Sequence, residues 1–175
     1  MRDCRTLLRI STLVPTKCRE LVADWPDFIV DKDASGQGVG GIMVMEKRAC
    51  VPTVFRYKWP DDIKADLVSE HNPNGRITNS DLEMAGLLML WLVMENVCDV
   101  ESGTHVALFS DNQHTVVSWV THMASKSSDV AGQLLRALSL RLKMKGVSPI
   151  TALHVLGKQN AMTDIPSCLF GSVPQ

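Results

Sequence analysis

Thr104-His-Val-Ala-Leu-Phe-Ser-Asp-Asn112 is the stretch around which the rest of the chain is arranged. A short apolar run bounded by polar residues is typical of a buried strand, and this one ends at Asp111. We therefore expect a central strand that carries a carboxylate to one edge of a sheet. Three other acids have comparable places: Asp33 ends an apolar run, Glu83 opens the longest apolar segment, and Asp164 lies in a final helical pattern.

Length and composition indicate one globular domain. The chain has 175 residues, of which 45% are apolar, so it can bury a core without metal or disulfide staples. Its 18 Lys and Arg nearly balance its 19 Asp and Glu, which excludes a polybasic tail. No acid occurs between Ala131 and Thr163, whereas five cations do: Arg136, Arg141, Lys143, Lys145 and Lys158. This run indicates a basic face for phosphate contacts or a solvated helix face.

The cysteines and the apolar segments indicate the compartment. The five cysteines are scattered without a Cys-x-x-Cys pair, as in reduced proteins of the cytoplasm or nucleus. The apolar run Met84–Met94 has 11 residues, too few to span a bilayer. We expect a cytoplasmic or nuclear protein without a membrane partner.

Hydrophobic periodicity predicts an α/β fold in which a mixed five-stranded sheet is flanked by helices. The expected strands are residues 27–33, 42–45, 51–59, 104–110 and 150–156, the first three as an antiparallel meander. The expected helices are one or two turns within 60–76, a long buried helix capped by Thr78, Asn79 or Ser80, and helices over 113–123, 129–145 and 160–168. The glycines at 36, 38, 40 and 41 permit positive φ, as in a turn, or close approach of the backbone to a neighbour. They lead into a strand, so a dinucleotide-binding motif is excluded.

Four acids on separate elements favour a divalent metal site, because hard cations prefer oxygen ligands. Each acid alone has a simpler explanation as a turn, cap or solvated residue. At two places the residues leave a choice open: Asp31 or Asp33 on the first strand, and Asp81 or Glu83 at the start of the long helix. Jointly, the four in this order favour a site that could hold two ions about 3.5–4 Å apart for phosphoryl chemistry.

Four motifs, in this order, carry a resemblance to a known family: Asp33-Ala-Ser with Gly38-Val-Gly-Gly41, Thr78-Asn-Ser-Asp-Leu-Glu83-Met-Ala, Phe109-Ser-Asp111-Asn, and Gly157-x-x-Asn160-x-x-x-Asp164. They resemble the type 1 ribonuclease H family, most of all the ribonuclease H domain that follows reverse transcriptase in retrotransposon polyproteins. The resemblance covers about residues 27–170. It implies strand order 3-2-1-4-5 and a ribonuclease H-like domain over residues 26–170, preceded by a lead-in at 1–25 and followed by a tail at 171–175.

The resemblance also implies a function. It identifies the metal ligands and catalytic residues as Asp33, Glu83, Asp111 and Asp164, holding two Mg²⁺ ions for which Mn²⁺ could substitute. The implied reaction is hydrolysis of the RNA strand of RNA:DNA hybrids, with a reverse transcriptase domain as partner in the same polyprotein. The nucleic-acid contacts are expected from Ser35, Asn79, Ser80, Asn112, Arg136, Arg141, Lys158 and Asn160.

The sequence departs from the family in two places. The segment Gly157–Asn160 is too short for the loop histidine of cellular members, and Ser167-Cys168 replaces a Ser-Arg pair. His154 is expected to be a packed strand residue. The alternative function is a catalytically decayed domain that binds nucleic acid or serves a structural role. A related exonuclease or transposase-type nuclease is disfavoured, because Asp31-Lys-Asp33 lacks the Asp-x-Glu usual in such exonucleases.

Overall fold

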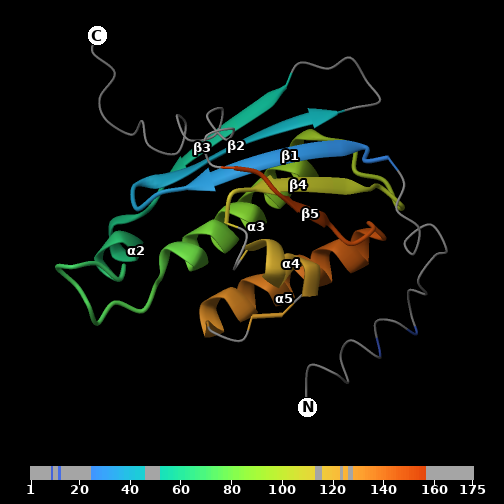
Figure 1. Ribbon diagram of the computed structural model, residues 1–175. Coiled ribbons are helices and arrows are strands. Elements are labelled where there is room, and N and C mark those ends of the chain that lie inside the picture. The colour runs from blue at the N-terminus through green and yellow to red at the C-terminus, as the bar shows by residue number, and fades with distance from the viewer. Residues whose placement is uncertain are drawn as a thin grey trace, which may run out of the picture.

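The computed structural model describes residues 9, 12, 25–45, 52–112, 116–122, 124–125 and 128–156 of the chain. Its five strands are β1 (Phe28–Ala34), β2 (Gly38–Met45), β3 (Thr53–Lys58), β4 (Val106–Ser110) and β5 (Thr151–His154). They form one sheet in the order β3-β2-β1-β4-β5 (Figure 1). The expected fold class and strand order are confirmed.

The directions of the strands determine which ends meet. β1 pairs antiparallel with β2 and β2 antiparallel with β3, as expected for the meander. β1 pairs parallel with β4, and β4 parallel with β5. Because β1 and β4 run in the same direction, their C-terminal ends lie at the same edge of the sheet.

The glycine-rich segment is mostly strand, and close approach, one of the two uses expected of its glycines, is confirmed at Gly41. The turn between β1 and β2 is short, and β2 already begins at Gly38. Gly41 lies inside that strand, where the Phe55 ring of β3 occupies the space that a side chain would need. An added Cβ would lie 2.2 Å from Phe55 Cε1, so this position requires glycine. Close approach between strands is a second use of glycine that its sequence pattern does not distinguish from a turn.

The described helices are α2 (Asp61–Ala65), α3 (Asn79–Val97), α4 (Ser118–His122) and α5 (Asp129–Lys145). Figure 1 shows α3, α4 and α5 on one side of the sheet. Thr78 is the N-cap of α3, which decides among the three residues expected to cap it. The expected helix at 113–123 is described only over Ser118–His122, and the expected helix at 160–168 lies outside the described residues.

Helix α3 is buried on most of its surface, as its apolar sequence predicts. One side contributes Met84, Leu87 and Trp91 to the main core, which lies between the sheet and α5. The other side contributes Leu82 to a smaller core with Val39, Trp59 and Ala34. Among the described helices, none combines the length and the apolar content needed to cross a bilayer.

Candidate metal centre

Three carboxylates from three different elements converge at one edge of the sheet. Asp33 lies near the end of β1, Asp111 follows β4, and Glu83 lies on α3. One oxygen of each lies within 4.8 Å of the others. No single helix or strand could present three carboxylates to one point in this way.

The parallel pairing of β1 with β4 brings Asp33 and Asp111 together. In that register Asp31 is paired with Phe109. Asp33 and Asp111 each lie two residues further along their own segments, so they end up side by side. Both side chains are half-buried at the point where the strands end. Backbone pairing therefore sets the separation of the two acids before any ligand is present.

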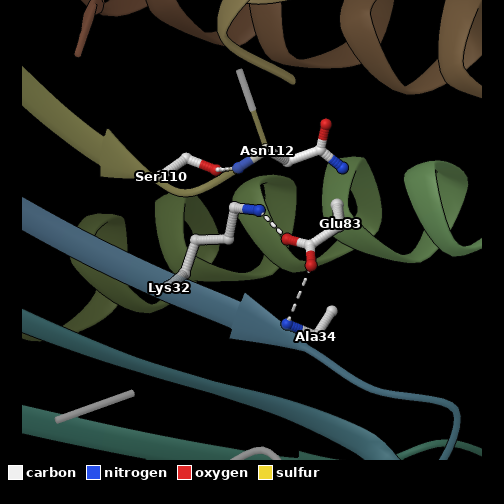
Figure 2. Close-up of polar contacts among 5 residues, drawn as sticks. All are labelled: Lys32, Ala34, Glu83, Ser110 and Asn112. Atoms are coloured by element: carbon white, nitrogen blue, oxygen red, sulfur yellow. Dashed lines mark hydrogen bonds and ion pairs between the residues drawn. The ribbon is translucent and has the colours of Figure 1, made fainter. Parts of the chain in front are cut away.

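Glu83 reaches the same edge from beneath the sheet, and β1 holds it there. Its carboxylate is buried, with 4% of the side chain exposed. Glu83 Oε2 forms an ion pair with Lys32 Nζ, and Glu83 Oε1 accepts a hydrogen bond of 3.3 Å from the Ala34 N–H (Figure 2). Both oxygens of Glu83 thus have partners on β1.

Lys32 is a site residue that the sequence analysis missed. It follows the alternation of β1, in which Phe28, Val30, Lys32 and Ala34 are buried and the residues between them are half-buried. The side chain of Lys32 is fully buried. The signal was present in the sequence, because a lysine on the apolar side of an alternating strand needs a buried acid as partner.

Burial and like charges both act on the acids of this edge. Burial raises the pKa of Glu83 above its ordinary value, the charge and hydrogen bond of Lys32 lower it, and Asp33 and Asp111 raise it. Burial also raises the pKa of Asp31 from 3.8 to about 7, with smaller contributions from the charges of Asp111 and Asp33. Burial and the neighbouring acids therefore disfavour the charged forms of Glu83 and Asp31, and a bound cation nearby would favour them.

The two choices that the residues left open differ in geometry. Asp31 lies close enough to Asp33 and Asp111 to interact with their charges, but the three-carboxylate cluster contains Asp33. Asp81 accepts hydrogen bonds from the backbone N–H and the hydroxyl of Thr78, at 2.8 and 2.7 Å, and completes the capping box of α3. It also accepts one from the Ser128 hydroxyl. Asp81 therefore binds the N-terminal ends of α3 and α5, whereas Glu83 belongs to the three-carboxylate cluster.

The remaining expected site residues are divided between three situations. Asp164, Lys158 and Asn160 lie outside the described residues. Asn79 and Ser80 occupy the first turn of α3, and Asn112 directly follows Asp111, its backbone N–H bonded to Ser110 Oγ (Figure 2). The Ser35 hydroxyl accepts hydrogen bonds from the backbone N–H groups of Gln37 and Gly38, so it already stabilises the turn before β2.

The two arginines of α5 lie at different distances from the carboxylates. Ser128 contacts Asp81 at the start of both long helices, and Arg141 forms an ion pair of 2.6 Å with Glu95 further along, so α3 and α5 run parallel. Glu95 follows Glu83 by twelve residues on the helix, which corresponds to about 18 Å along its axis. Arg141 is therefore remote from the cluster. Arg136 is exposed on α5, between Ser128 and Arg141.

The expectation that the side chain of His154 is packed is wrong. It is the last residue of β5, level with Ser110 of β4, and its side chain is exposed. Strand β5 is at the sheet edge, and three of its four residues are exposed, so its apolar sequence did not imply burial.

The donor set fits a hard divalent cation. All three groups offer carboxylate oxygens, which Mg²⁺ and Mn²⁺ prefer over nitrogen and sulfur. Asp33 and Asp111 are half-buried and so remain accessible from solvent.

Comparison with solved structures assigns the five-stranded sheet and its helices to a known fold. The structure superimposes on the N-terminal ribonuclease H domain of a Mycobacterium tuberculosis protein, solved as a fusion with maltose-binding protein. The TM-score is 0.55 at 15% identity, covering 79% of this chain and 94% of that one. The chain has the ribonuclease H fold.

A second ribonuclease H structure gives the same result. LC11 ribonuclease H1, isolated from compost, matches with a TM-score of 0.51 at 17% identity, over 80% of this chain and 91% of that chain. The prototype foamy virus protease–reverse transcriptase matches with a TM-score of 0.50 at 13% identity, over 89% of this chain but 22% of that chain. No protein-family model and no curated protein matches this ribonuclease H-fold chain by sequence.

Proposed function

We propose that this chain is a metal-dependent endoribonuclease that hydrolyses the RNA strand of RNA:DNA hybrids. The observation that carries the proposal is the convergence of Asp33, Glu83 and Asp111 from three elements onto one edge of a ribonuclease H fold. The likeness to ribonuclease H domains from a mycobacterium and from compost supports the choice of substrate.

The residues of the chain would supply position and charge. Asp33 and Asp111 present oxygens from the ends of paired strands, and Glu83 is held by Lys32 and Ala34. Asp164 is proposed as a fourth ligand. The ion is proposed to be Mg²⁺, with Mn²⁺ as a substitute, and when bound it would stabilise charge on the scissile phosphate and lower the pKa of an attacking water.

Hybrid recognition is proposed to depend on backbone shape and on the 2′-hydroxyl of the RNA strand. Asn79, Ser80 and Asn112, each within four residues of a cluster acid along the chain, are the proposed partners of the 2′-hydroxyls. Ser35 would have to exchange the hydrogen bonds of its own turn to take part. Arg136, Lys158 and Asn160 are proposed to contact phosphates, so cleavage would show little preference for sequence.

The domain is further proposed to belong to a retroelement polyprotein that carries a reverse transcriptase. The prototype foamy virus structure supports this, because the matched part is 22% of a larger protease–reverse transcriptase chain. The same proposal keeps residues 1–25 as a lead-in from a preceding domain, residues 26–170 as the nuclease domain and residues 171–175 as a tail.

The test is cleavage of an end-labelled RNA:DNA hybrid in Mg²⁺, in Mn²⁺ and in EDTA, beside RNA and DNA duplexes of the same sequence. We expect cleavage of the hybrid only, and only with metal. Asp111→Asn should reduce the rate by at least about 100-fold, the size of effect seen when a group that stabilises transition-state charge is removed. Asp99→Asn, an exposed acid beyond α3, is the matched control and should leave the rate unchanged. A hybrid that binds but is never cleaved would identify the alternative, a decayed nucleic-acid-binding domain.

A further inference from the structure

Lys32 places a positive charge against one member of the carboxylate cluster, Glu83. Its side chain is fully buried, and its Nζ forms an ion pair with Glu83 Oε2. Asp33 is the next residue along β1, and its side chain lies with those of Glu83 and Asp111 in the cluster. The ammonium therefore lies at a position where a cation would otherwise neutralise Glu83.

The protein holds this ammonium firmly. The alternation of β1 directs Lys32 toward α3, where its stem passes beside Gly86: a Cβ on Gly86 would lie 3.7 Å from Lys32 Cδ, an ordinary packing distance. Withdrawal of Lys32 would leave Glu83 charged and buried without its counter-ion, a costly state. The Ala34 N–H holds the second oxygen of the same carboxylate.

Two cations cannot share Glu83 without strong repulsion. A divalent ion on Glu83 Oε2 would lie within a few ångströms of the ammonium, in a buried setting where charges are poorly screened. Asp33 and Asp111 differ, because both are half-buried and face the solvent side of the cluster. The space between those two carboxylates is the part of the site that remains suited to an added ion.

We propose that Lys32 is a built-in cation that replaces one of the two divalent ions implied by the family resemblance, so that the site binds a single ion, held mainly by Asp33 and Asp111. Lys32 is then a positioning residue that holds Glu83 in place of the second metal. This inference rests on the proposed function, because it concerns the same metal site.

The test is the number of Mn²⁺ ions bound per chain, measured by electron paramagnetic resonance of free Mn²⁺ during titration of the full chain. The wild type should bind one ion at the cluster. Lys32→Met should bind two ions, or one ion at least about tenfold more tightly, since removing one nearby positive charge removes a repulsion of more than 1.4 kcal/mol. Lys64→Met, which removes a lysine paired with Asp61 on the surface of α2, should match the wild type.

Thermal unfolding gives a second readout. In EDTA, Lys32→Met should unfold at a lower temperature than wild type, and saturating Mn²⁺ should raise its midpoint more than it raises that of the wild type. The double variant Lys32→Met/Glu83→Gln removes both charges and should regain stability in EDTA without the larger response to Mn²⁺.

The outcomes separate this inference from the proposed function. Two ions per wild-type chain, or equal stoichiometry and affinity in wild type and Lys32→Met, would overturn the role of Lys32 even when Asp111→Asn abolishes binding. The wild-type count decides this even where Lys32→Met fails to fold. Absence of Mn²⁺ binding in wild type and in Lys32→Met alike would overturn both the inference and the metal site itself.

Discussion

Asp81 and Ser128 join the N-termini of α3 and α5. The Ser128 hydroxyl donates to Asp81 Oδ1 and accepts from the Ala131 N–H, so it caps α5 while it binds the acid that completes the capping box of α3. Two residues after Asp81, Glu83 enters the carboxylate cluster. The position of Glu83 therefore depends on a junction between two helix ends that contains no ligand of the site.

Asp81→Ala should lower the free energy of unfolding by about 1–2 kcal/mol, because it removes the capping box and the hydrogen bonds that Asp81 accepts from Thr78 and Ser128. Urea denaturation in EDTA measures this change. Asp99→Ala, the exposed control, should stay within about 0.5 kcal/mol of wild type. An Asp81→Ala protein as stable as wild type would show that the junction does not hold the two helices.

Two glycines in helices should respond to alanine with opposite signs. A Cβ on Gly86 of α3 would lie 2.7 Å from Val39 Cγ2, so Gly86→Ala should destabilise by about 1–3 kcal/mol through overpacking. A Cβ on Gly132 of α5 meets nothing within 4 Å, so Gly132→Ala should stabilise by about 0.5–1 kcal/mol through its helix preference. Chemical denaturation of both variants measures the signs. Equal effects would contradict the close approach of α3 to β2.

Asp31 should make the metal-free protein less stable as the pH rises. Its folded pKa of about 7 lies above the ordinary 3.8, so the folded state holds this proton more tightly. The resulting stability is fully present below about pH 4 and is lost as the pH rises through 7. Asp31→Asn should therefore flatten the pH dependence and, above pH 7, stabilise by about 1–2 kcal/mol, a figure reduced for solvent screening of a half-buried group.

The measurement is the unfolding midpoint in urea between pH 4 and pH 8.5, in EDTA. Asp99→Asn again serves as the control, because its carboxylate is exposed away from the cluster. A wild-type protein with the same pH profile as Asp31→Asn would contradict the burial of Asp31 among like charges.

The two arginines expected to contact nucleic acid should differ in their effect on hybrid binding. Arg136→Ala should weaken binding and reduce the salt dependence of log K by about 0.7–0.9, the value for one phosphate contact. Arg141→Ala should have a smaller effect, because Arg141 is paired with Glu95 far along α3, and should cost at most about 1 kcal/mol of stability. Fluorescence anisotropy with a labelled hybrid in Ca²⁺ at several salt concentrations measures both. An Arg141→Ala effect as large as that of Arg136→Ala would place the hybrid along the whole of α5.

Local sequence determined most of the elements of this protein. Alternation over residues 27–33, the apolar segment that follows Thr78 and the polar limits of residues 129–145 depend on neighbours along the chain, so β1, α3 and α5 could be predicted without a partner. The sequence also showed that Asp33, Glu83 and Asp111 lie on separate elements. Their catalytic role is a prediction.

Tertiary structure alone decided which of the polar residues meet. Asp81 caps α3 through Thr78, three residues away along the chain, but only packing brings Ser128 of α5 to Asp81 and places Glu83 in the cluster beside β1. Lys32 becomes a site residue because the pairing of β1 with β2 and β4 directs its side chain toward α3. There it forms an ion pair with Glu83. Periodicity is a property of one segment, whereas a buried charge is stabilised by groups that the fold brings from elsewhere, and its partner can be known only once the elements have packed.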